Sequence, residues 1–122
     1  MEIRENGKIV EVEYGPDEQI TVSLQHQVRA ALAKAILQHP VGLLVQVPTS
    51  LRQLDVGVAA FWMGGMRELA PGLKAMAAVT TSRGLRFFAD NFSKTLELVG
   101  TRVPIRVFEN GAAAREWLEE VV

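Results

Sequence analysis

Residues 41–47 have the sequence VGLLVQV, in which every residue except Gly42 and Gln46 is a large aliphatic one. A nearly continuous apolar run of this length is typical of a strand that is buried on both faces, as strands of parallel sheets are. The run follows His39-Pro40, and a helix ends there because a residue before proline disfavours the α conformation. The sequence therefore predicts a central parallel strand over residues 41–47.

A hairpin is predicted ahead of this strand. Asn6-Gly7 separates two β-type runs, residues 2–5 and 8–14, and both turn residues tolerate a positive φ. The second run alternates, which indicates one buried face. Its apolar residues, Val10, Val12 and Tyr14, share one face. Its acidic residues, Glu11 and Glu13, share the other face, which we expect to be solvated.

Helical and strand patterns alternate along the rest of the chain. Predicted helices run from Thr21 or Ser23 to about His39, over 56–69, from Ser82 to about Val99, and onward from Asn110. Two further strands are predicted at 73–79 and 103–108. The last helix should turn one face inward, and we expect Trp117 on that face to be buried. The inward residues are Ala114, Trp117, Leu118 and Val121.

This order of elements predicts a single α/β domain over residues 1–122. A β-hairpin is followed by αβαβαβα, and strands that alternate with helices pair in parallel through right-handed crossovers. The last strand alternates apolar and basic residues, so the helices should lie mainly on one face of a five-stranded sheet in sequential order. The other face should be only partly covered.

The composition excludes several functional classes. The chain has 122 residues, 48% hydrophobic and 22% charged, with a formal net charge of −1, so no basic stripe is available for nucleic acid. No apolar segment approaches the roughly 18–20 residues that cross a bilayer. There is no cysteine for disulfides or thiol catalysis, and the charged first residues do not form a signal peptide. We expect a cytoplasmic protein of bacterial type without a cofactor.

Four segments carry a family resemblance: HPVGLLVQVPTSLRQLD (39–55), LKAMAAVTTS (73–82), LRFFADNF (85–92) and VPIRVFENGAAAREWLEE (103–120). They resemble SpoIIAA-like members of the STAS superfamily, and above all small stand-alone bacterial domains of undefined function. The resemblance implies a sheet in sequential strand order with helices mostly on one side. It also implies a regulatory or protein-interaction role without catalysis.

The best-known members of that superfamily are anti-sigma-factor antagonists. Their switch is a phosphorylated serine that follows an aspartate at the start of the second helix. Here Asp55 is followed by Val56 and Gly57, so no hydroxyl is available at that position. Thr49 and Ser50 are nearby but do not occupy the motif position. The resemblance therefore implies a domain without this phosphorylation switch.

Catalytic arrangements are poorly supported by the sequence. The two histidines, His26 and His39, lie at opposite ends of one predicted helix and cannot share a metal. Ser50, His39 and Asp55 are the residue types of a catalytic triad, but the sequence around Ser50 lacks the nucleophile elbow that would present the serine. We predict no enzymatic activity and no metal site.

The segment from Thr80 to Gly84 follows a predicted strand and leads into a helix. Ligands gather at the carboxyl ends of strands in open α/β sheets, and helix N-termini attract anions. An anion or ligand loop is one interpretation, and a well-capped turn is the other. The loop residues concerned are Thr81, Ser82 and Arg83.

Surplus apolar surface is the stronger functional signal. At 100° per residue, the outward side of the second helix holds a small apolar set with one aromatic ring: Gly57, Ala60, Phe61 and Gly64. On the third helix Phe87 and Leu98 point outward, whereas the inward set is Leu85, Phe88, Phe92, Leu96 and Val99. Outer aromatics on two neighbouring helices would form a contiguous patch that marks a partner site. The fourth helix could instead cover them.

Three functions remain open. The first is a protein-interaction module, either a homodimer or one that docks another protein through this patch. The alternative is a carrier of a small apolar ligand or lipid, with aromatic side chains around a pocket between helices: Phe61, Trp62, Phe87, Phe88 and Phe92. The third is a nucleotide or anion sensor at the strand ends. A flat surface favours the first function, and a pocket lined by aromatics favours the second.

Overall fold

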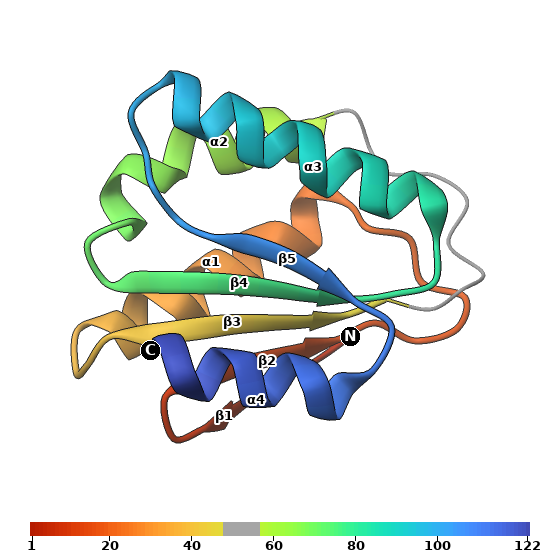
Figure 1. Ribbon diagram of the computed structural model, residues 1–122, viewed down its shortest axis with the longest axis horizontal. Coiled ribbons are helices and arrows are strands. Elements are labelled where there is room, and N and C mark those ends of the chain that lie inside the picture. Colours follow the sequence, from red (N-terminus) through yellow and green to blue (C-terminus); the bar gives the residue numbers. More distant parts are fainter. Residues whose placement is uncertain (48–56) are drawn as a thin grey trace.

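A computed structural model describes residues 1–47 and 57–122 and contains one five-stranded sheet (Figure 1). The strands lie in the order in which they occur in the chain. Only the first strand runs antiparallel to its neighbour, as predicted. Their bounds are β1 (Glu2–Asn6), β2 (Ile9–Glu13), β3 (Val41–Gln46), β4 (Leu73–Val79) and β5 (Ile105–Phe108).

The hairpin of β1 and β2 forms at the predicted dipeptide. Asn6 pairs with Ile9 across the turn, and Gly7 has a φ of +62°, in the left-handed region that glycine adopts without strain. On β2, Val10 and Val12 face the larger part of the core. The alternation of the second arm was therefore interpreted correctly for its apolar face.

Four helices connect or follow the strands: α1 (Val22–Ile36), α2 (Gly57–Leu69), α3 (Arg83–Leu98) and α4 (Gly111–Val121). Three have side-chain caps, because the side chains of Thr21, Ser82 and Asn110 accept bonds from backbone N–H groups of the first turn. The helix predicted to reach His39 ends at Ile36. There the N–H groups of Gln38 and His39 both bond to the carbonyl of Ala35, which closes the last turn before Pro40.

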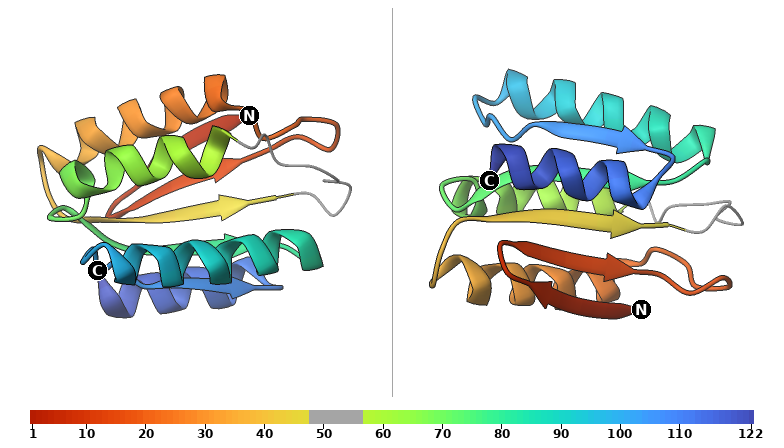
Figure 2. Two further views of the ribbon diagram at one scale, coloured as in Figure 1. Left: turned by 90° about the horizontal axis from the view of Figure 1, so that it is seen from above. Right: turned by 60° about the horizontal axis from the view of Figure 1, so that its bottom comes forward.

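The helices divide between the two faces of the sheet. Buried residues of α1, α2 and α3 share one core cluster, whereas α4 packs on the opposite face against β3 and β4 (Figure 2). Gly42 lets α4 approach, because a Cβ there would lie 2.8 Å from Val122 Cγ2 and 3.0 Å from Leu118 Cδ2. The helices thus lie mainly on one face, as predicted.

Three side chains predicted to point inward are less enclosed. Trp117 is only partly buried and lies beside Phe108, with ring centroids 5.7 Å apart, because Ala114 and Leu118 form the buried line of α4. Val121 is 42% exposed at the end of that helix. Val99 is also exposed, because α3 ends at Leu98 and the next residue no longer follows the helical face. In the described part of the chain no helix has both the length and the apolarity to cross a bilayer.

Candidate functional site

An apolar cavity of about 100 Å³, partly open at the surface, lies between the sheet and the three helices on the same face. Its wall contains the aromatic rings of Trp62 from α2 and of Phe88 and Phe92 from α3, with aliphatic side chains from α1, β3 and β4. Protein interiors are packed as densely as organic crystals and leave few voids larger than a water molecule. A cavity of this size is therefore a distinct feature of the fold.

Helix packing and small side chains account for the space. Helix α2 packs mainly against α1, whereas α3 packs mainly against β5. The lining includes three alanines, Ala77 and Ala78 on β4 and Ala89 on α3, where larger residues would fill the volume. The cavity therefore results from the sequence at these positions and from the spacing of the helices.

Three polar side chains form a chain of hydrogen bonds in the cavity wall. The indole Nε1 of Trp62 donates to Gln25 Oε1 at 2.9 Å, and Gln25 Nε2 donates to the hydroxyl of Tyr14 at 2.6 Å. Burial raises the pKa of Tyr14, the bond from Gln25 lowers it less, and the charge of Glu18 raises it further. The hydroxyl therefore stays protonated near neutral pH.

Sequence reasoning did not single out Gln25, although a signal was present. On α1 the buried residues recur at helical spacing as Gln25, Val28, Leu32 and Ala35. A glutamine within an apolar stripe must find buried partners, because an unpaired amide in a core is costly. The interruption of the stripe was thus a detectable sign of a polar group inside the fold.

The residues of the predicted surface patch lie in different surroundings. Phe61 is half-buried against α1, with its ring 4.5 Å from the ring of His26 and 5.7 Å from the guanidinium of Arg29. Ala60 and Gly64 are exposed, and Gly57 is partly buried. On α3, Phe87 is 72% exposed and Leu98 is 86% exposed. The outward position assigned to Phe61 was wrong, because helical phase alone does not show which side a neighbouring helix covers.

The loop before α3 is occupied by its own capping bonds. Ser82 Oγ accepts from the N–H of Leu85 at 3.2 Å, and Thr80 Oγ1 accepts from the N–H of Ser82 at 3.0 Å. Thr81 and Arg83 are exposed. Thr81 shares a groove at the carboxyl ends of the strands with Glu2, Glu13 and Glu109. These carboxylates disfavour a bound anion, and anion binding at this loop stays a prediction.

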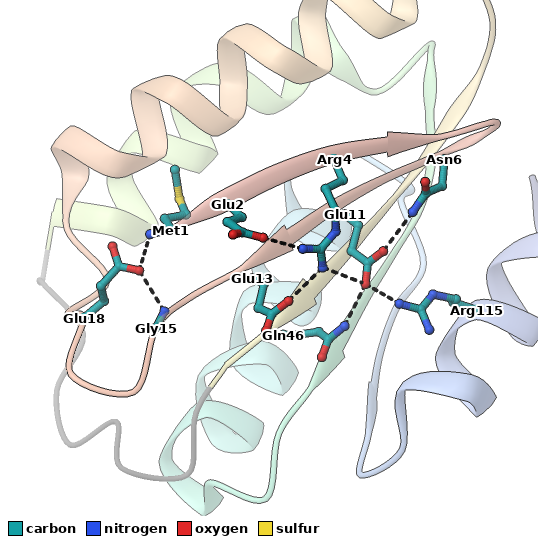
Figure 3. A network of polar contacts seen from close by, with 10 residues as sticks. All are labelled: Met1, Glu2, Arg4, Asn6, Glu11, Glu13, Gly15, Glu18, Gln46 and Arg115. Carbon is teal, nitrogen blue, oxygen red and sulfur yellow. Dashed lines mark hydrogen bonds and ion pairs between the residues drawn. The ribbon is translucent and has the colours of Figure 1, made fainter.

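A polar network lies on the opposite face of the sheet, around Glu11 (Figure 3). This carboxylate is 1% exposed and accepts bonds from Gln46 Nε2 at 2.7 Å, from Asn6 Nδ2 at 3.1 Å and from Arg115 Nη2. Arg4 Nη2 lies 3.5 Å from it and bonds to the exposed Glu13 at 2.7 Å. The network joins the hairpin, β3 and α4.

The solvated face predicted for β2 is wrong at Glu11, because α4 covers that position and brings Arg115 to it. Burial raises the pKa of Glu11, but the bonds from Gln46 and Arg115 and the charges of Arg115 and Arg4 outweigh it. The pKa of Glu11 consequently lies below its ordinary value, and the group is charged at neutral pH.

Of the residues weighed for catalysis, the structure describes only the two histidines. The ring of His26 lies edge-on to the ring of Phe61, and His39 is exposed just after the end of α1. Ser50 and Asp55 lie outside the described residues, as do Thr49 and Val56 of the switch region. Within residues 1–47 and 57–122 no group of three or more histidine or acidic side chains could hold a metal ion.

The fold defines the class of the protein as a small mixed α/β domain, with a largely apolar cavity between the sheet and three helices. The chain belongs to the SpoIIAA-like family, whose sequence profile matches residues 9–119, and it is a STAS-like domain. No curated protein sequence matches the chain.

A crystal structure of similar fold supports this assignment. It is that of an uncharacterised protein of the DUF3478 family, with a SpoIIAA-like fold, from Shewanella loihica PV-4. The two chains are 16% identical, and the match covers 96% of this chain and 90% of the other with a TM-score of 0.63. At this level of identity the likeness shows a shared fold.

Proposed function

We propose that this chain is a non-enzymatic binding domain that takes one small apolar molecule into the cavity between the sheet and helices α1 to α3. One observation carries the proposal: of the five aromatic residues expected to line a pocket in a carrier, Trp62, Phe88 and Phe92 line the cavity, whereas Phe61 and Phe87 do not. Phe61 instead packs on α1, so the continuous surface patch expected of an interaction module loses one of its two rings.

The size of the cavity limits the ligand. An engineered apolar cavity of about 150 Å³ binds benzene. The cavity here measures about 100 Å³, so benzene is near the upper limit of what it takes whole, and it also suits the apolar end of a longer molecule. Burying roughly 150–200 Å² of apolar surface at about 25 cal/mol per Å² supplies roughly 4–5 kcal/mol, which corresponds to a Kd of about 1 mM or somewhat lower.

Titration of the ¹⁵N-labelled protein with benzene tests the proposal. The wild type should show saturable shifts of the Trp62 indole N–H. Ala89→Leu places a larger side chain in the cavity wall and should abolish these shifts while the fold is retained. Ala60→Leu makes the same change on the exposed side of α2 and should bind as the wild type does. Equal binding by all three proteins, or no binding by the wild type, would contradict the proposal.

A second candidate function is self-association through α3. Phe87 and Leu98 are 72% and 86% exposed, and their spacing of three helical turns places them on one side of the helix. Large exposed apolar residues on one stripe are typical of an interface, and a second copy of the chain is the default partner because a two-fold interface is self-complementary.

Sedimentation velocity tests this second candidate. Replacing Phe87 and Leu98 together with serine should shift the protein toward the monomer and change the free energy of unfolding by no more than about 0.5 kcal/mol, because both side chains are exposed. Phe61→Ser should instead destabilise the fold, because that ring packs on α1. A wild type that stays monomeric at its highest soluble concentration would rule out self-association.

A further inference from the structure

In the hydrogen-bonded chain of Trp62, Gln25 and Tyr14, the donor and the acceptor of each bond can be assigned. An indole N–H can only donate, so the atom of Gln25 that faces Trp62 must be the amide oxygen. The amide nitrogen of Gln25 is then the atom that faces Tyr14, and it donates to the phenolic oxygen at 2.6 Å. The Tyr14 hydroxyl therefore acts as an acceptor toward Gln25, and its own proton must be directed elsewhere.

Among residues 1–47 and 57–122 the Tyr14 hydroxyl takes part in one hydrogen bond, and in that bond it is the acceptor from Gln25. The side chain of Tyr14 is only 6% exposed, so bulk water does not readily replace an acceptor. Buried hydroxyl groups in folded proteins almost always use their proton in a hydrogen bond. Tyr14 also lines the cavity, beside Gln25 and Trp62. The cavity thus combines apolar walls with a directed donor, the hydroxyl of Tyr14.

Resting on the function proposed above, we propose that the ligand carries a neutral hydrogen-bond acceptor, a carbonyl or ether oxygen, which receives the proton of Tyr14. The remainder of the ligand is then the apolar group that contacts the aromatic wall. A hydrocarbon fits the walls, but it leaves the hydroxyl unused. A ketone or ether of the same shape satisfies both parts of the cavity.

The surroundings favour a neutral acceptor over an anion. The walls opposite the polar chain are aliphatic and aromatic, and transfer of a carboxylate into such surroundings is costly. The charge of Glu18 lies near enough to raise the pKa of Tyr14, and it would repel a negative ligand in the same way. Because burial also raises that pKa, the hydroxyl keeps its proton at the pH at which the protein would bind the ligand.

Two isosteric probes test the inference. Cyclopentanone and methylenecyclopentane have the same number of heavy atoms, and they differ in an oxygen acceptor against a methylene group. Each is titrated into the wild type and into Tyr14→Phe, which keeps the ring and removes the hydroxyl. The variant should bind cyclopentanone about 3- to 10-fold more weakly, the loss expected for one hydrogen bond, and should bind methylenecyclopentane with unchanged affinity.

A second measurement does not depend on the variant folding. The carbonyl stretch of ¹³C-labelled cyclopentanone bound to the wild type should lie at lower frequency than in a hydrocarbon solvent, because the oxygen accepts a hydrogen bond. Binding of both probes with no effect of Tyr14→Phe and an unshifted carbonyl would overturn the inference and leave the apolar function intact. Failure of both probes to bind the wild type would overturn the proposed function and the inference with it.

Discussion

Truncating Trp62 to alanine is expected to lower the free energy of unfolding by about 3–5 kcal/mol, the cost of removing a large buried aromatic side chain. The ring is 6% exposed, and the cavity already lies beside it, so the neighbouring side chains can fill only part of the lost volume. The change also removes the donor to Gln25 Oε1, which is buried on α1. Urea unfolding followed by circular dichroism measures the loss.

Trp117→Ala is the matched control for this prediction. That ring is only partly buried beside Phe108, so we expect a smaller loss of about 1–2 kcal/mol. Indole added to Trp62→Ala should raise its melting temperature, because a ligand that binds only the folded state stabilises it. Equal losses for the two tryptophan variants would contradict the assignment of Trp62 to the cavity wall.

Replacing Arg115 with methionine should cost about 2–3 kcal/mol at neutral pH, because it removes a charged hydrogen-bond donor from a carboxylate that is 1% exposed. Methionine keeps much of the aliphatic stem that packs on the sheet. Glu68→Gln, which breaks the exposed pair with Arg29, should cost less than about 1 kcal/mol. Chemical unfolding of the two variants tests the difference.

The same network predicts how stability depends on pH. The pKa of Glu11 in the folded chain lies below its ordinary value of 4.5, so the folded state binds a proton less readily than the unfolded state. Its contribution is therefore fully present above pH 4.5 and is lost as the pH falls through the folded pKa. Glu11→Gln should weaken this acid-side decline in unfolding measurements. A decline as steep as that of the wild type would show that other groups cause it.

The order of strands could be predicted from the sequence because it depends on local patterns. The Asn6-Gly7 turn, the apolar run of residues 41–47 and the alternation of helical segments each specify one step of the chain. Because connections between parallel strands are right-handed, few arrangements of these strands in a sheet remain. These features explain why the predicted order of all five strands is confirmed.

The environment of individual side chains could not be predicted in the same way. Glu11 is buried because of Arg115, which lies 104 positions away in the chain, and no local pattern connects the two. The cavity depends on the summed volumes of side chains from six elements, among them Ala89 and Leu43. Helical phase identified Phe88 and Phe92 as inward-facing, but it could not show whether the space beside them would be filled.

A crystal of the wild-type protein under xenon pressure tests the central claim most directly, because xenon enters apolar cavities and is located by its strong scattering. The cavity account predicts one xenon atom enclosed by Val28, Trp62 and Phe92, and its absence from the same position in Ala89→Leu. A wild-type crystal in which xenon occupies only surface sites, with these side chains in mutual contact, would contradict it.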